Sequence, residues 1–532
     1  MGNLASKVKI YAAAAAQLKE TYDLLNKRIE APPGIPVPNP TLPFWTVPAS
    51  AITTDDEPLP DNADIVIIGS GITGTSVAYN ALSNGGKVTI VILEARAVCS
   101  GATARNGGHI NPPLYHDYAE LEKTFGEDAT KQMIRFRLAH RQEMQRIAEK
   151  EDIVKGSQVR ETEHLDVFSC LKTYEEAKNN LRIWKSAMPD ESHTFGFVDA
   201  AEAVEKYHLS PGTVGCIYGS GGAMHPYRFV TSLLAKLLDD YSESLHIATH
   251  TPCTAISAPS TNEPRYVVET PRGSIKALHV VHATNGWCSQ LLEPMRTKLV
   301  PARGVMSAQR PGTLLRNSTL DGARSYVFYR GGTGYDYLTQ LPTGEHELMF
   351  GGGWAQSCEN SLPDIGISDD SVFNFAGAAH LAGSLPLYFG GDNWGGEATP
   401  AEEPEGDVRW GIGRTKAQWS GILGISTDFL PWVGRLPAKV SGRAEPLASL
   451  AGSSESEKEG PRKSTRLAAP GEWLAAGYTG EGMVHAWMSG KALAWMVLDR
   501  EDALAGWFPD ILRVTEKRWK QASMDTLVAR FV

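Results

Sequence analysis

The feature that most constrains the fold of this chain is an apolar run that leads directly into three spaced glycines. Residues 63–68 are apolar except for Asp64, as expected of a strand buried on both faces of a parallel sheet. Gly69, Gly71 and Gly74 follow in the pattern Gly-x-Gly-x-x-Gly. The first glycine permits a tight turn, the second lets backbone N–H groups approach a pyrophosphate, and the third lets a helix pack closely on the strand. This pattern predicts a dinucleotide-binding βαβ unit.

The residues after the glycines complete that unit. Residues 75–82 are compatible with a helix that stops at Gly85 and Gly86, and residues 87–93 predict a second strand. Glu94 ends this strand, where a carboxylate can accept hydrogen bonds from a ribose hydroxyl. The fingerprint by itself fits either FAD or NAD.

Further segments in a fixed order along the chain carry a family resemblance. They resemble the glycine/D-amino-acid oxidase (DAO) family of FAD-dependent oxidoreductases, from about residue 62 to 500. The version with Arg105-Asn106-Gly107-Gly108 is most similar to the γ-glutamylputrescine oxidase branch. The segments are residues 99–109, 224–230, 280–287, 301–304, 349–353, 419–431 and 476–483.

The resemblance implies an α/β fold. A Rossmann-like FAD-binding domain of the glutathione-reductase type would be interleaved with a substrate domain built on an antiparallel sheet. Short alternating runs within residues 265–355 favour such a sheet, and the apolar spacing over 119–150 predicts one long helix. We expect an N-terminal helix and Pro-rich extension over 1–62, an FAD-binding domain over 63–118, 205–300 and 410–500 with a surface insertion at 441–470, a substrate domain over 119–204 and 301–409, and a helical tail over 501–532.

The resemblance also implies a reaction class. The flavin N5 of FAD would accept a hydride from the carbon next to nitrogen in an amine or amino acid. The resulting imine would hydrolyse, and O2 would reoxidise the flavin to give H2O2. Two alternatives stay open: a dehydrogenase or tailoring enzyme of specialised metabolism with another electron acceptor, and a non-catalytic flavoprotein scaffold.

The implied cofactor contacts come from the fingerprint and from the family-like segments. A glycine turn at 477–482 precedes an apolar helix at 483–498, so its N–H groups and the helix dipole would stabilise negative charge on reduced flavin. Relatives that attach FAD covalently use a Cys or a His where this chain has Gly421 or Arg105, so we expect non-covalent FAD. The expected contacts are Gly69, Gly71, Ile72, Thr73, Gly74, Glu94, Ala95, Arg96, Ser100, Gly101, Thr103, Arg105, Asn106, Gly107, Gly108, Cys253, Ala283, Thr284, Asn285, Gly477, Gly480, Glu481, Gly482 and Met483.

Substrate residues are sought among aromatic and polar side chains that would face the flavin. Alternate residues of one strand share a face, which aligns Tyr335 with Tyr337, and an aromatic cage suits an amine. Met349 stands where oxygen-activating relatives carry Lys, which leaves oxidase and dehydrogenase both open. Arg303 is interpreted as a structural ion pair rather than a carboxylate clamp, which favours an amine or modified amino acid as substrate. The catalytic candidates are His109, Tyr335, Tyr337, Trp419 and Glu481, with Tyr329 and Trp354 as further candidates.

Composition limits which partners and which location are expected for this chain. The net charge of −10 offers no broad basic surface, so nucleic acid is not expected as a partner. The six cysteines are scattered without a CxxC pair, which predicts reduced thiols, a cytoplasmic location and no metal site. No apolar run is long enough for a transmembrane segment. Gly2 and Ser6 fit the N-myristoylation pattern, which would give a weak lipid anchor, and an unmodified solvated helix is the alternative.

Overall fold

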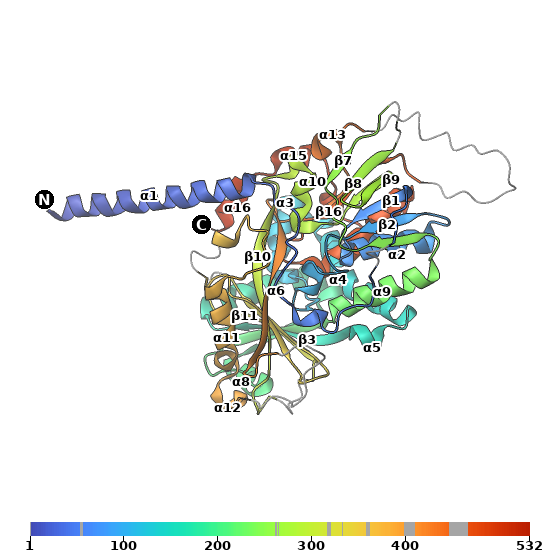
Figure 1. The fold of residues 1–532 in the computed structure, drawn as a ribbon. Coiled ribbons are helices and arrows are strands. Elements are labelled where there is room, and N and C mark those ends of the chain that lie inside the picture. The colour runs from blue at the N-terminus through green and yellow to red at the C-terminus, as the bar shows by residue number, and fades with distance from the viewer. Residues whose placement is uncertain are drawn as a thin grey trace.

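Two eight-stranded sheets with helices packed on them form the body of the molecule in the computed structural model (Figure 1). The structure describes residues 2–53, 57–260, 263, 265–315, 321–331, 334–357, 362–397, 410–445 and 467–531. Most of the expected surface insertion at 441–470, and the end of the expected substrate segment at 398–409, lie outside the described residues. The α/β fold class predicted from the sequence is confirmed.

The first sheet contains the predicted βαβ unit. Its strands run in the order β15-β16-β9-β1-β2-β6, parallel from β16 to β6, with β7 and β8 attached beside β9. Both faces of β1 are buried, which explains its apolar sequence. The strands are β1 (Asn62–Ile68), β2 (Ile90–Leu93), β6 (Leu245–Ala248), β7 (Ala255–Ser257), β8 (Tyr266–Thr270), β9 (Gly273–His282), β15 (Trp432–Arg435) and β16 (Gly471–Ala476).

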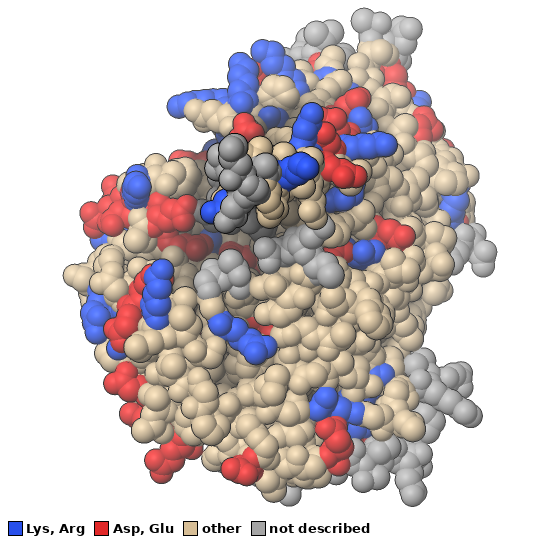
Figure 2. Space-filling view, turned by 90° about the vertical axis from the view of Figure 1, so that its left-hand side faces the viewer, with Lys and Arg blue, Asp and Glu red and all other residues tan. Residues whose placement is uncertain are grey.

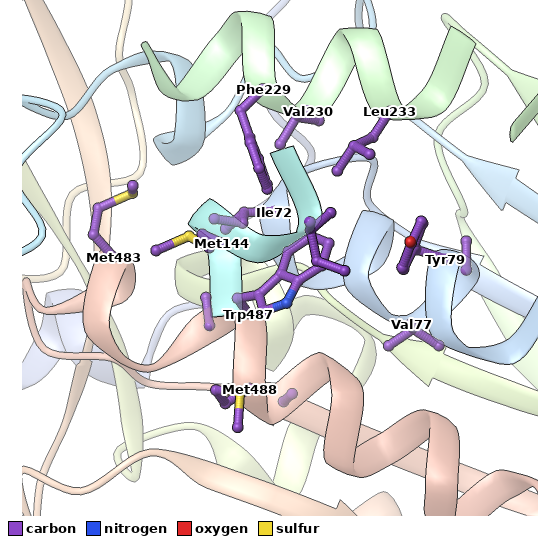
Figure 3. Packing of buried hydrophobic residues seen from close by; sticks show 14 of the residues in the cluster. Ile72, Val77, Tyr79, Met144, Phe229, Val230, Leu233, Met483, Trp487 and Met488 are labelled. Carbon is purple, nitrogen blue, oxygen red and sulfur yellow. The ribbon is translucent and has the colours of Figure 1, made fainter. Parts of the chain in front are cut away.

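Three helices cover one face of this sheet: α2 (Ile72–Asn84), α9 (Pro226–Asp240) and α14 (Ala486–Val497). Trp487 of α14 lies between the other two helices and stacks edge-on against Phe229 at 5.3 Å between ring centroids (Figure 3). Gly490 allows the close crossing, because a Cβ there would lie 2.7 Å from the backbone oxygen of Thr73. Ile72 and Met483 belong to the same cluster, so this core also supports the cavity described below.

The second sheet runs in the order β14-β10-β13-β12-β11-β3-β5-β4. Its pairs are antiparallel except for β11 and β3. Helices α8 (Ala200–Tyr207) and α11 (Phe375–Phe389) pack on one face, and α3 (Leu114–Phe125) and α6 (Leu171–Ala187) pack on the other. The strands are β3 (Arg160–Phe168), β4 (Gly196–Asp199), β5 (Gly215–Ala223), β10 (Leu299–Gln309), β11 (Arg324–Tyr329), β12 (Asp336–Gln340), β13 (Leu348–Gly352) and β14 (Thr415–Ser426).

Three local expectations need correction. The helix expected over 119–150 is divided at Gly126, which has a φ of +83°. Helix α3 ends before this residue, and α4 (Glu127–Lys150) begins after it. The alternating run at β8 belongs to the first sheet, not to the substrate sheet. Strands β5 and β14 belong to the second sheet, although we assigned their residues to FAD-binding segments, because they pair along β3 and β10. The domain division as a whole stays a prediction.

The N-terminal helix α1 (Gly2–Glu30) projects from the body, and only its C-terminal end packs against other elements (Figure 1). Leu25 and Ile29 are buried there beside Val300 and Ile365. The described residues of the Pro-rich stretch that follows contain only the short helix η1 (Phe44–Thr46), and its Phe44 and Trp45 are buried. The remaining α-helices of the described residues are α5 (Val154–Ser157), α7 (Pro189–Ser192), α10 (Cys288–Leu291), α12 (Gly391–Trp394), α13 (Ala438–Ser441), α15 (Glu516–Gln521) and α16 (Met524–Phe531).

On the face drawn in Figure 2, basic and acidic side chains are interspersed. Among the described helices, none combines the length and apolar character that crossing a membrane requires. The five cysteines that the structure describes are free thiols, and Cys358 lies outside the described residues.

Candidate active site

A cavity of about 550 Å³ lies between the two sheets, within the range of about 300–1,000 Å³ usual for small-molecule sites. The residues that follow the ends of the parallel strands β1, β2 and β9 form one part of its wall, here called the first-sheet end. Strands β10, β12, β13 and β14 form the opposite part, here called the second-sheet end. Ligands bind at the carboxyl ends of parallel strands in open α/β sheets, so the cavity lies where a dinucleotide is expected.

The three fingerprint glycines have the geometry that a pyrophosphate cradle needs. Gly69 has a φ of +108°, and a Cβ there would lie 2.7 Å from the backbone oxygen of Ala283. A Cβ at Gly74 would lie 2.0 Å from the backbone oxygen of Gly69, so only glycine allows α2 to pack on the strand. Gly71 precedes the N-terminus of α2 and lines the cavity, which leaves a bare backbone at the positive end of the helix.

Glu94 is held rigidly at the first-sheet end. The hydroxyl of Ser70 donates to its carboxylate at 2.6 Å, and the backbone N–H of Arg96 donates to the other oxygen at 3.1 Å. The carboxylate is thereby oriented at the end of β2, beside the glycine turn. This is the geometry expected for binding a ribose hydroxyl.

Two arginines of the segment after β2 meet one buried carboxylate. Arg96 Nη1 lies 2.9 Å from Asp370 Oδ1, and Arg105 Nε lies 3.4 Å from Asp370 Oδ2. All three side chains are almost fully buried. Burial lowers the pKa of Arg105 to about 10, although the carboxylate of Asp370 opposes the shift. These ion pairs hold the cavity-lining stretch from Ala95 to Asn106 in place.

Two buried polar groups and a glycine turn are further features of the cavity wall. The hydroxyl of Thr284 and the indole nitrogen of Trp287 are buried without a hydrogen-bond partner among the described residues. The glycine turn at 477–482 leads into the short helix η7 (Gly482–Val484), and Gly477 and Gly480 have positive φ there, as the turn requires. Buried polar groups are normally hydrogen-bonded. The cradle, the oriented carboxylate and these orphaned groups together fit FAD.

Aromatic side chains form the second-sheet end. The rings of Tyr335 and Tyr337 lie 6.5 Å apart and both line the cavity, together with Trp354. Tyr329 on the neighbouring strand β11 lies behind them, with its ring 5.8 Å from that of Tyr335 and its hydroxyl 3.0 Å from His116 Nε2. The strand geometry therefore brings together the three tyrosines that the sequence singled out.

A charged cluster stands beside these rings. Glu481 lines the cavity, and its carboxylate lies 3.5 Å from Arg137 Nη2 and 3.3 Å from His485 Nε2. Arg137 is buried and also pairs with Asp117 at 2.9 Å. Burial, joined by the charge of Arg137, lowers the pKa of His485 well below its usual value, so this ring is neutral. Two carboxylates therefore share one guanidinium.

Most predicted contacts line the cavity. They are Gly69, Gly71, Ile72, Thr73, Glu94, Ala95, Arg96, Gly101, Thr103, Arg105, Asn106, Cys253, Ala283, Thr284, Asn285, Gly480, Glu481, Gly482, Met483, Tyr335 and Tyr337, with Trp354. Their contacts with cofactor and substrate stay predictions.

Besides Tyr329, described above, seven predicted residues lie outside the cavity lining. They are Gly74, Ser100, Gly107, Gly108, Gly477, His109 and Trp419.

Most of these seven support the wall from behind. Ser100 Oγ accepts a hydrogen bond from Arg96, and the buried Trp419 donates its indole N–H to the backbone oxygen of Arg105 at 3.0 Å. A Cβ at Gly107 would lie 2.7 Å from the ring of Tyr337. Gly108 packs as tightly, with a φ of +71° and the backbone oxygen of Met224 2.4 Å from a notional Cβ.

His109 also stands one layer back from the cavity. Its ring lies 5.9 Å from that of Tyr337, and its Nε2 lies 3.2 Å from Asn111 Nδ2. Burial lowers the pKa of His109 to about 3, helped by the neighbouring His164. A neutral histidine behind the wall fits a positioning role better than direct contact with substrate.

Gly421, Met349 and Arg303, which the sequence analysis discussed as possible functional positions, lie in structural surroundings. Gly421 lines the cavity, and a Cβ there would lie 2.9 Å from the Cβ of Arg105. Met349 is fully buried in β13 and is not a lining residue. Arg303 pairs with Asp364 at 2.8 Å, as the structural interpretation required.

The sequence reasoning missed several lining residues. Met306, Gly352 and Ile422 come from the second sheet, and strand alternation could have found them once pairing was known. Trp287 is the last residue of the segment 280–287 that we singled out, and Gln290 follows that segment. Residues 34–36 of the Pro-rich extension also line the cavity, and no local signal marked them.

Comparisons with known proteins agree with this geometry. The model of the DAO family, described as FAD dependent oxidoreductase, matches residues 64–496. A comparison with curated protein sequences finds no significant match.

Solved structures share the fold. Glycine oxidase from Geobacillus kaustophilus aligns with a TM-score of 0.58 and 16% identity, over 86% of this chain and 99% of that chain. L-proline dehydrogenase from P. horikoshii aligns with a TM-score of 0.60 and 16% identity, over 87% and 100%. L-amino acid deaminase from Proteus myxofaciens aligns with a TM-score of 0.59 and 14% identity, over 90% and 99%. At these identities the likenesses establish the fold alone.

The family model covers most of the chain, including every segment that forms the glycine cradle and the oriented carboxylate. The chain therefore belongs to the DAO family and is an FAD-dependent oxidoreductase.

Proposed function

We propose that this enzyme oxidises the C–N bond of a cationic amine to an imine, which water then hydrolyses to a carbonyl compound and a free amine. The observation that carries the proposal is the charge of the second-sheet end. Glu481 lines the cavity and is close enough to Tyr335 of this end to add to the effect of burial in raising the pKa of that side chain. In contrast, the two cationic side chains among the described lining residues, Arg96 and Arg105, both engage Asp370. A substrate carboxylate would meet no dedicated arginine clamp among the described lining residues, but an ammonium group would meet a carboxylate.

The charged cluster strengthens this preference. Asp117 and Glu481 both pair with the guanidinium of Arg137, so these three side chains carry one net negative charge when both carboxylates are ionised. Burial raises the pKa of Asp117, and the charge of Arg137 opposes that shift. The neutral His485 adds no compensating charge. In a partly buried site this charge favours a bound cation more than it would in water.

The tyrosine and tryptophan side chains suit the rest of such a substrate. Tyr335, Tyr337 and Trp354 offer ring faces to an ammonium group and apolar surface to the carbon chain. When bound, FAD would supply the two-electron acceptor for the substrate hydride and pass the electrons to O2, giving H2O2. The ammonium must lose a proton before that hydride leaves, and Glu481 is the described carboxylate at this end that can take it.

A matched substrate screen tests the proposal. Each primary amine is paired with the amino acid that carries an α-carboxylate on the same side chain, and flavin reduction is followed without oxygen. We expect reduction by the amines, and an increase in KM of about tenfold for Glu481→Gln, equivalent to ~1.4 kcal/mol. The exposed Glu293→Gln serves as the control and should leave KM unchanged. A preference for the amino acids, or an unchanged KM in Glu481→Gln, would overturn the assignment.

The electron acceptor needs a separate measurement. Peroxide formed per turnover is compared in air with turnover on an added dye. Stoichiometric peroxide supports oxygen as the acceptor, and turnover only with the dye supports a dehydrogenase. The γ-glutamylputrescine-oxidase-like branch, the non-covalent cofactor and the cytoplasmic location stay predictions.

A further inference from the structure

The Pro-rich stretch after α1 takes part in the cavity although it lies outside the family match at 64–496. Residues 31–48, here called the N-terminal strap, contain no regular element besides η1. Gly34, Ile35 and Pro36 line the cavity at its first-sheet end.

Hydrogen bonds fix the first half of the strap on both sides of these three residues. The hydroxyl of Ser368 donates to the Pro33 carbonyl at 2.5 Å, and the Gly34 N–H donates to Gln290 Oε1 at 2.9 Å. Arg96 Nη1 donates to the Val37 carbonyl at 3.3 Å. The cavity-lining residues are therefore held between fixed points rather than left as a loose end.

The second half of the strap is tied to the segment that runs along the cavity. Thr41 N–H donates to the Asp370 carbonyl at 2.8 Å, and Arg105 Nη1 donates to the Thr41 carbonyl at 2.9 Å. Trp45 is 1% exposed and donates its indole N–H to the Asn106 carbonyl at 2.6 Å. Together with the Arg96–Val37 bond, the strap and the cavity-lining stretch 95–106 thus share hydrogen bonds at three places.

The neighbours of residues 34–36 indicate which part of a dinucleotide lies there. Glu94 and Arg96, where a ribose hydroxyl is expected, line the same end of the cavity. The indole nitrogen of Trp287, a buried residue of this wall, has no hydrogen-bond partner in the part of the chain that the structure describes. Ile35 is 43% exposed although it is a cavity-lining apolar side chain, so its surface is available to a bound group.

We infer that the N-terminal strap is a wall of the FAD site that covers the adenosine half of the cofactor. Ile35 supplies apolar contact, and the fixed backbone of residues 34–36 excludes water from that end of the cavity. The strap acts through affinity for FAD, and this assignment does not depend on the substrate class.

The test is FAD release from the full-length holoenzyme after dilution, followed by the recovery of flavin fluorescence. Ile35→Ala should raise the Kd for FAD about threefold to tenfold through lost apolar contact. Ile35→Asp should raise it more than about tenfold, because its carboxylate would be placed near the anionic cofactor. Leu42→Ala and Leu42→Asp are matched controls, since Leu42 is 48% exposed in the same strap but does not line the cavity.

FMN distinguishes the two halves of the cofactor, because it lacks the adenosine. In the full chain loaded with FMN, the Ile35 variants should release flavin within about twofold of the parent rate. An equal effect on FAD and FMN would place the strap at the flavin instead and overturn the inference. An unchanged Kd for FAD in Ile35→Asp, or equal losses in the Leu42 variants, would also overturn it. The thermal midpoint of each variant checks that its fold is retained.

Discussion

Asp370→Asn should be among the most damaging single changes outside the cavity lining. The Asp370 side chain is 0% exposed and holds two guanidinium groups, with Arg96 at 2.9 Å and Arg105 at 3.4 Å. Removing one partner of a buried ion pair costs about 3–5 kcal/mol, because the opposite charge stays buried without compensation. Here two buried cations would face an amide that retains one acceptor oxygen, so we expect a loss in that range. The Asp370 carbonyl still accepts from Thr41, so the strap contact itself survives the change.

The assay is the thermal midpoint of the full chain, together with the fraction of FAD retained after gel filtration. Glu293→Gln is the matched control, because it breaks an ion pair with Arg296 in which the Glu293 side chain is 78% exposed. An exposed pair contributes only about 0–1 kcal/mol, so this control should melt with the parent protein. We expect Asp370→Asn to melt well below both and to retain less FAD. Equal midpoints for the two variants would refute the view that this buried triad organises the cavity wall.

Two further predictions concern packing and pH. Gly74→Ala should abolish FAD retention, because its Cβ would meet the Gly69 carbonyl at 2.0 Å, whereas Gly383→Ala in open space on α11 should retain the cofactor by flavin absorbance. Burial lowers the pKa of His140 from 6.5 to about 3 in the folded protein. As the pH falls below 6.5, His140 is therefore protonated in the unfolded chain before it is protonated in the folded one, and the free energy of unfolding decreases. His140→Gln should therefore lose less of its thermal midpoint between neutral pH and about pH 5 than the exposed control His193→Gln, and equal losses would contradict the assignment.

Much of the fold prediction depended on patterns of residues that are close in sequence. The run at β1, the three glycines and Glu94 depend on neighbours close in sequence, so spacing and residue type were enough to infer the βαβ unit. The tyrosines at 335 and 337 could be aligned because a strand alternates its faces. The assignment of β5 and β14 to a sheet could not be made in this way, because it depends on pairing with strands far along the chain.

The charged groups around the cavity illustrate the same limit. In the sequence, nothing distinguishes Arg137 from the other polar residues of its helix, α4. Asp117 belongs to α3, most of which we predicted as part of the same helix as α4. The ion pair of Arg137 with Glu481 joins residues more than three hundred positions apart. His109 and Trp419 were placed in the site by sequence position, yet the packing leaves them behind its wall.

The sequence alone therefore determined the βαβ unit and its resemblance to an FAD-binding family, because close-range sterics restrict those positions to glycine and to apolar residues. Only the tertiary structure decided what encloses the cofactor. The N-terminal strap has no periodicity to mark it, since its prolines prevent a helix and leave its backbone groups to bond elsewhere. Its partners Asp370, Gln290 and Asn106 are brought to it by folding, and those long-range hydrogen bonds convert an irregular extension into part of the cavity wall.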